Sequence, residues 1–388
     1  TTDGFHIWSE VFDRHLEDIF EVQDEIALKI AAKLKENFIL NERSPQQLSQ
    51  GTDNVEAYNL YLKAQYFWYK WSPEYALKAI EYYNRALDVA PNYAKAYSGL
   101  ASCYSYLAAT GHLSPSDAYT KAEQAARKAI DLDNHMVESH VALGLVRLFY
   151  KWNFKGALKS FKKALKLNPE SAKANHALSF YAKVVGDFPA ALHLLQQALK
   201  VDPLSAVYKS DLARAYLGLG NVEKALNEFN EILQFDPEFR TAAEGRGWCY
   251  VMLEDYENAR REFKKYRKMI GKEYQGITQL GYVEAKMGNT DKVGEYLALL
   301  EHRQRQHPDQ PLSMDFALIF LGLSKPDRVF HYLEQALEER LGSVLFIDTS
   351  SLWDEIKGDK RYRKFIKRIG LEQAPNLAGL GSAINPTA

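Results

Sequence analysis

The chain has 388 residues and balances 49 Lys and Arg against 50 Asp and Glu, so its formal net charge is −1. This balance provides no overall field for nucleic acid or anionic lipid, and binding to either would require a local patch. Two cysteines cannot build a disulfide framework, which favours a reducing, cytoplasmic location. No stretch of the sequence has the apolar length that a membrane-spanning helix needs.

The first forty residues predict a strand followed by a long helix. Residues 4–12 alternate apolar and polar side chains, whereas residues 16–38 carry apolar side chains at helical spacing. A lone strand is unstable, so we expect it to belong to a preceding α/β domain, to fray, to pack on the first helix pair, or to pair with a second copy in a homodimer. Residues 41–53, rich in Ser, Gln, Asn and Gly, are predicted to form a linker.

The central part of the chain repeats with a period of 34 residues. Pro169, Pro203 and Pro237 stand at equal intervals, and each follows small and large apolar residues at fixed offsets. These residues are Ala157, Phe161 and Ala164, then Ala191, Leu195 and Ala198, then Ala225, Phe229 and Ile232. We interpret each unit as a helix pair in which Ala lets two backbones approach, the large residue fills the space between them, and Pro ends the second helix.

The first helix of each pair has marks of its own, which include Leu212, Ala213, Tyr216 and Gly220 in one unit and Gly247 and Tyr250 in the next. With the second-helix pattern, these residues resemble the tetratricopeptide repeat (TPR) family. Looser copies extend the array to residues 54–341 and give eight pairs. The resemblance implies an all-α solenoid, a right-handed superhelix of helix pairs.

The amino-terminal string resembles the end of a TolB-like α/β domain. The residues that carry this resemblance are Gly-Phe-His-Ile-Trp-Ser-Glu from Gly4, then Asp13-Arg14, then Ile-Phe-Glu-Val-Gln-Asp-Glu-Ile-Ala from Ile19. Such domains precede TPR arrays in bacterial adenylate cyclases and winged-helix transcription regulators. The resemblance implies that residues 1–40 close such a domain and that the chain is the carboxy-terminal part of a longer protein.

Residues 342–371 are predicted to cap the last hydrophobic face of the array. The cap begins with an apolar, β-branched piece at 343–347, expected to be extended, and ends in a helix over 360–369. That helix is expected to dock through Tyr362, Phe365, Ile366 and Ile369.

Seven basic residues stand against Asp359 between 357 and 368. We interpret them as a solvated helix face, and contact with an acidic partner or nucleic acid is the alternative. The tail 372–388 is predicted to be disordered.

A search for chemistry finds no catalytic residue. The nucleotide-binding loop and the nucleophile motif Gly-x-Ser-x-Gly are both missing from the sequence. The histidines are scattered without Cys or carboxylates at ligand spacing, so neither a metal site nor a cofactor is predicted. We expect the chain to be non-enzymatic.

The TPR resemblance implies a concave groove, lined by the first helices, that receives extended peptides or partner helices. The stripe that points inward predicts a binding site made of Lys173, His176, Phe180, Lys183, Arg214, Trp248, Tyr282 and Lys286. Its aromatic and basic groups suit a protein segment with an acidic side chain or carboxylate. Alternatively, Phe180 and Trp248 only pack against neighbouring helices. The Lys and Asn pair typical of chaperone-tail binding does not occur at the equivalent positions.

Two classes of function follow. The first is a protein-interaction scaffold that serves as the regulatory or sensing part of a larger bacterial signalling protein. The second is the carboxy-terminal part of an enzyme of the adenylate cyclase type, whose catalytic domain lies upstream of this chain.

Overall fold

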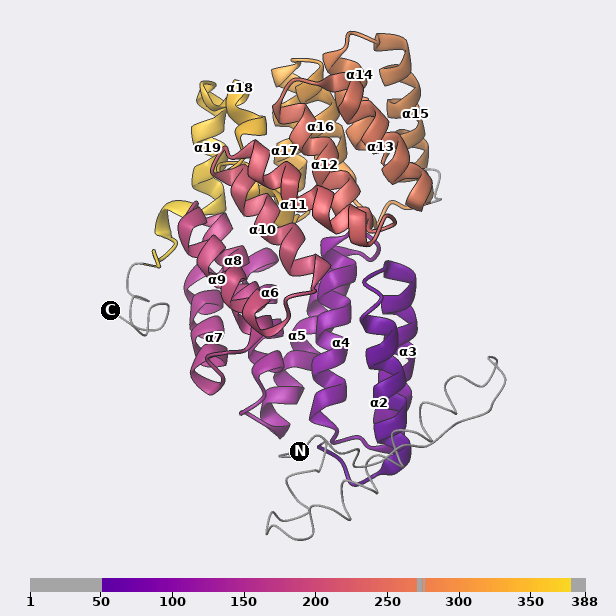
Figure 1. The fold of residues 1–388 in the computed structure, drawn as a ribbon, viewed down its shortest axis with the longest axis vertical. Helices are drawn as coiled ribbons and strands as arrows, with labels where there is room; N and C mark the ends of the chain where they lie inside the picture. Colours follow the sequence, from indigo (N-terminus) through magenta and orange to yellow (C-terminus); the bar gives the residue numbers. More distant parts are fainter. Residues whose placement is uncertain (1–50, 271–273, 275, 378–388) are drawn as a thin grey trace, which may run out of the picture.

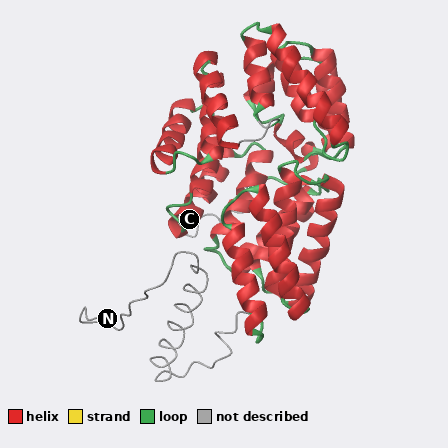
Figure 2. Cartoon of the chain, turned by 90° about the vertical axis from the view of Figure 1, so that its right-hand side faces the viewer, coloured by secondary structure: helices red, strands yellow, loops and turns green. Residues whose placement is uncertain are grey.

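A computed structural model describes residues 51–270, 274 and 276–377. All regular structure in these residues is helical, and eight antiparallel helix pairs follow one another along the chain (Figures 1 and 2). The predicted all-α repeat solenoid is therefore confirmed. The strand, the long helix and most of the linker predicted before residue 54 lie outside the described residues.

The first helices of the eight pairs are α2 (Val55–Trp68), α4 (Ala94–Ala109), α6 (Val137–Phe149), α8 (Ala172–Val184), α10 (Ala206–Gly218), α12 (Arg240–Met252), α14 (Ile277–Lys286) and α16 (Ser313–Gly322). The second helices are α3 (Pro73–Val89), α5 (Pro115–Leu132), α7 (Phe154–Leu167), α9 (Phe188–Val201), α11 (Val222–Phe235), α13 (Tyr256–Ile270), α15 (Thr290–Gln306) and α17 (Pro326–Glu338). None of the helices in the described part of the chain is long and apolar enough to cross a membrane.

Four successive second helices begin at intervals of 34 residues, the same period as that of the prolines. Asn153, Asp187, Asn221 and Asp255 each accept a hydrogen bond from the backbone N–H three residues ahead, at the start of a second helix. These side chains satisfy donors that the first turn of a helix leaves without an internal partner. The sequence therefore fixes where successive helices begin as well as where they end.

Glycine on one helix and an aromatic ring on the next hold the pairs together. A Cβ atom at Gly144 on α6 would lie 2.4 Å from the Phe161 ring of α7, and one at Gly247 on α12 would lie 2.3 Å from the Phe263 ring of α13. Both rings are fully buried. The prediction that the large residue fills the space between two closely packed backbones is confirmed.

The stack of pairs curls back on itself, so that distant units touch. Gln310 Nε2, in the connection from α15 to α16, donates to the His112 carbonyl oxygen beyond α4 at 3.3 Å. Tyr181 Oη on α8 donates to the Pro375 carbonyl oxygen at 2.7 Å. The segment around Pro375 therefore packs against the middle of the array.

The cap consists of short helical pieces: η3 (Gly342–Phe346), η4 (Ser351–Trp353), α18 (Asp354–Lys357), α19 (Lys360–Ile369) and η5 (Leu371–Gln373). The predicted docking helix is confirmed as α19, and its four predicted apolar residues are buried.

Two details of the predicted cap are corrected. The piece 343–347 is a 3₁₀ turn and not an extended strand, because its backbone N–H groups bond three residues back, from Val344 to the Leu341 carbonyl at 3.2 Å and from Ile347 to the Val344 carbonyl at 3.3 Å. Order continues beyond residue 371, since Leu377 is 3% exposed. The prediction of disorder is therefore wrong for residues 372–377.

Candidate functional site: the row of first helices

The predicted binding residues lie on α8, α10, α12 and α14, which are neighbouring first helices. His176, Lys183 and Tyr282 are buried, with 9%, 6% and 4% of their surface exposed. The other five, which are half-buried, are Lys173, Phe180, Arg214, Trp248 and Lys286. Of the eight predicted binding residues, only these five therefore have substantial side-chain surface open to contact.

A buried carboxylate holds two of the predicted residues. Asp211 on α10 accepts from Lys183 Nζ at 2.6 Å and from His176 Nε2 at 2.7 Å, both on α8. The Lys183 ammonium also lies 4.4 Å from the centre of the Phe180 ring. The Lys183 and His176 side chains hold the pKa of Asp211 well below its usual range, against the effect of burial. This cluster joins consecutive repeats.

The remaining three cations also have carboxylate partners within the chain. Lys173 lies 3.5 Å from Glu138 on α6, Arg214 lies 3.4 Å from Glu244 on α12, and Lys286 lies 3.4 Å from Glu355 on α18. Sequence reasoning missed all of these acidic partners because it considered each stripe by itself. The sequence nevertheless contains a signal for two of these pairs. Glu244 stands at the inward-facing position of its repeat and Glu138 stands next to one, so each could have been predicted to pair with a cation of the adjacent repeat.

The predicted aromatic anchors are engaged with other rings. Phe180 meets Phe149 of α6 with 5.8 Å between ring centres, and Trp248 lies 5.1 Å from Phe263 and 5.8 Å from Tyr282. These edge-to-face and tilted contacts are favourable packing geometries. Packing against neighbouring rings therefore covers part of the Phe180 and Trp248 side chains, and the rest of each side chain is exposed to solvent.

Residues 342–357, which we call the inner segment, lie along the ends of several first helices. The Phe346 ring is 6.1 Å from that of Phe149 at the end of α6, and Ser351 Oγ is 3.8 Å from Met252 Sδ at the end of α12. Glu355 then reaches Lys286 at the end of α14. One stretch of the chain thus runs beside the row of first helices from α6 to α14.

Both cysteine side chains are buried. Burial raises the pKa of both thiols, that of Cys249 to about 12, so neither is a reactive thiolate at neutral pH. Within the described ranges, no three His, Cys, Asp or Glu side chains come together as a metal site.

Comparisons with known proteins agree with this architecture. Residues 185–249 match the family model described as tetratricopeptide repeat. The solved structure of the APC/C hetero-tetramer Cut9–Hcn1 resembles the chain with a TM-score of 0.52 at 14% identity, over 82% of this chain and 59% of that one. Residues 185–249 therefore match the tetratricopeptide repeat, and the described residues fold as a TPR-like solenoid of helix pairs.

Two curated bacterial proteins share a part of the sequence. "Putative adenylate cyclase 3" of Rhizobium meliloti (strain 1021) is 31% identical over 149 residues, which cover 37% of this chain and 24% of that protein. "Transcriptional regulator HilA" of Salmonella typhimurium is 28% identical over 127 residues, which cover 33% and 23%. The matches span about a quarter of the length of these relatives.

Proposed function

We propose that this chain is a non-catalytic scaffold that binds an extended polypeptide segment or a partner helix along its row of first helices. The inner segment is the observation that carries the proposal. It already lies beside this row, with the Phe346 ring on Phe149 and the Glu355 carboxylate on Lys286. These intrachain contacts support binding of a polypeptide that offers one aromatic and one acidic side chain.

The internal ion pairs restrict the chemistry of the partner. An acidic side chain must compete with Glu138, Glu244 or Glu355 for its cation, because each cation already has a carboxylate close by. The exposed parts of Phe180 and Trp248 offer apolar contact without such competition. We propose a protein or peptide partner, acidic at one position, and not a membrane or nucleic acid. A second copy of the chain that supplied the segment would form a homodimer.

The whole protein is proposed to be a larger cytoplasmic signalling protein of a bacterium, in which this array is the regulatory or sensing part. The partial likeness to a transcriptional regulator supports this reading. The second candidate is the carboxy-terminal part of an adenylate cyclase, favoured by the 31% identity over 149 residues. Conversion of ATP to cyclic AMP by the complete gene product would select the second candidate.

Peptides selected from a display library against the chain test the binding surface. We expect Trp248→Ala to weaken them by about 1 to 3 kcal/mol, which is roughly 5- to 150-fold in Kd, and Arg214→Ala to weaken them as well. Lys159→Ala, on the outer surface of α7, is the matched control and should leave Kd unchanged. Fluorescence polarisation gives Kd, and circular dichroism confirms folding. Binding that survives both row variants would place the partner elsewhere.

A further inference from the structure

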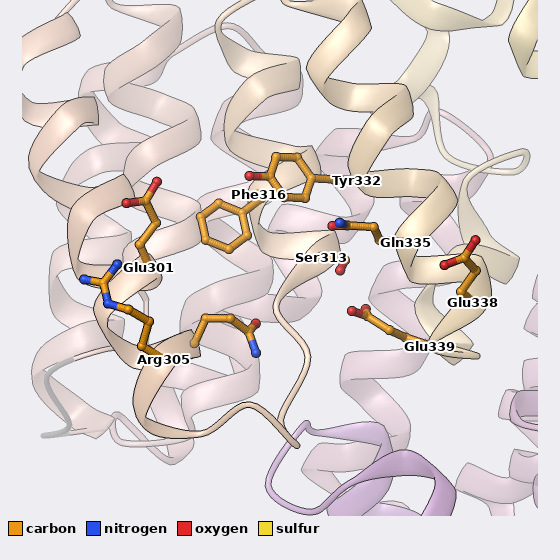
Figure 3. Close-up of a pocket in the computed structure, with 9 residues that line it drawn as sticks. Glu301, Arg305, Ser313, Phe316, Tyr332, Gln335, Glu338 and Glu339 are labelled. Carbon is orange, nitrogen blue, oxygen red and sulfur yellow. The ribbon is translucent and has the colours of Figure 1, made fainter.

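A hollow of about 560 Å³ opens between α15 and α17 above α16 (Figure 3). The connection from Gln306 to Ser313 contains Pro308 and Pro311 and is longer than the connection from α9 to α10. This connection lets α15 stand away from α16, whereas other second helices pack closely against the next first helix. The hollow uses none of the eight predicted binding residues on α8, α10, α12 and α14, so it is a separate site.

The floor of the hollow is aromatic. The rings of Phe316 and Tyr332 stack with 4.8 Å between centres and 18° between planes, and Phe320 stacks on Tyr332 at 5.6 Å. The faces of such rings attract cations. The Arg328 guanidinium already lies 4.4 Å from the centre of Phe320, which shows that this stack accepts a positive charge.

The walls of the hollow are acidic. Among the lining residues, Glu301 of α15 and Glu338 and Glu339 at the end of α17 supply three carboxylates, and Arg305 supplies one guanidinium. Arg328 adds a second guanidinium, 5.5 Å from the centre of the Tyr332 ring. In Figure 3 the Glu339 carboxylate lies beside Ser313 and points into the hollow. The hollow therefore combines a surplus of negative charge with an apolar floor.

One oxygen of Glu339 lacks a partner. The Ser313 hydroxyl donates a hydrogen bond to the Glu339 carboxylate. Glu339 Oε2, however, is buried without any hydrogen-bond donor among the described residues. Burial raises the pKa of Glu339, and the charge of Glu338 raises it further. A buried acceptor without a donor is unfavourable, so a rotation of this carboxylate that brings Oε2 to a ligand N–H group would remove this cost.

We propose that this hollow binds a primary ammonium group on an apolar stem. The ammonium pairs with the Glu339 carboxylate, which turns its unpartnered Oε2 toward the hollow, and is also attracted by Glu338 and Glu301. The stem lies on the Phe316 and Tyr332 rings. A lysine side chain of a partner protein and a free diamine share this chemistry. Arginine fits less well, because its planar guanidinium favours bidentate pairing with a single carboxylate.

Titration of the full chain with 1,5-diaminopentane and with a blocked lysine tripeptide tests the proposal by calorimetry at low salt. We expect saturable binding that Glu339→Gln and Phe316→Ala each weaken at least tenfold. Glu295→Gln, an exposed position on α15 away from the hollow, is the matched control and should bind like the parent chain. Pentan-1-ol, which has the same stem without the charge, should not bind.

The two probes distinguish the source of the ammonium group. Tighter binding of the tripeptide indicates a lysine side chain of a partner, and tighter binding of the diamine indicates a free amine. Lack of saturation with both probes would overturn the proposal. Equal affinity of the parent chain and a folded Glu339→Gln variant would also overturn it. Trp248→Ala should leave this binding intact, so the result is independent of the binding surface on the row.

Discussion

Lys183 Nζ and Asp211 Oδ1 lie 2.6 Å apart on consecutive first helices, and both side chains are 7% exposed. Such an ion pair favours one position of α8 relative to α10. Sliding one helix along the other would separate two buried charges, which is unfavourable. His176 adds a second donor to the same carboxylate. The cluster therefore restricts how these repeats stack.

Removal of the carboxylate should destabilise the array. Asp211→Asn leaves Lys183 as a buried charge without its counter-charge, so we expect a loss of about 3–5 kcal/mol in the free energy of unfolding, measured with urea. The double variant Lys183→Met with Asp211→Leu removes both charges and should lose less. An Asp211→Asn variant as stable as the parent chain would show that the ion pair contributes nothing.

The same carboxylate predicts loss of stability in acid. The pKa of Asp211 is lowered in the folded chain, so the unfolded chain binds more protons as the pH falls below the ordinary Asp pKa of about 3.9. The contribution is complete near neutral pH and is lost progressively below about pH 5. Melting temperatures between pH 7 and pH 3 should fall more steeply for the parent chain than for Asp211→Asn. Parallel profiles would contradict this assignment.

Glycine should be required for stability at the helix contacts where an aromatic ring packs directly against it. Gly247→Ala places a Cβ atom 2.3 Å from the Phe263 ring, so one of the two helices must move, at a cost of about 1–3 kcal/mol. Gly294→Ala is the control, because nothing lies within 4 Å of its Cβ position on α15. There the better helix propensity of Ala should be neutral or slightly stabilising. Thermal melts of the two variants give the comparison.

The cap should contribute to the stability of the array through its buried ring. Phe365 on α19 is fully buried, so Phe365→Ala should cost about 3–5 kcal/mol in denaturant unfolding. Lys364→Ala, on the exposed side of the same helix, should change little. Equal effects of the two substitutions would mean that α19 is not docked as described.

The repeats could be predicted from the sequence, whereas the burial and the ion-pair partners of the predicted binding residues could not, for a physical reason. Ala, Gly, the large residue and Pro act between neighbouring helices, so a local pattern such as Ala157 with Phe161 is enough to predict a pair. The burial of Tyr282 depends on how the whole stack curls and on where the cap returns. The inner segment has no repeat period, and no local pattern links Glu355 to Lys286, 69 residues away. The hollow beside Glu339 likewise depends on a single long connection.

Zero-length carbodiimide cross-linking of the unmodified chain, read by peptide mass spectrometry, tests most directly whether a polypeptide segment occupies the row of first helices. Lys286 Nζ and Glu355 Oε1 are 3.4 Å apart and both side chains are partly exposed, so an amide link between them should form. Lys173 and Glu138, 3.5 Å apart within the row, provide the internal control. A map that contains both links supports the account. A map that contains the Lys173–Glu138 link but lacks the Lys286–Glu355 link would contradict it.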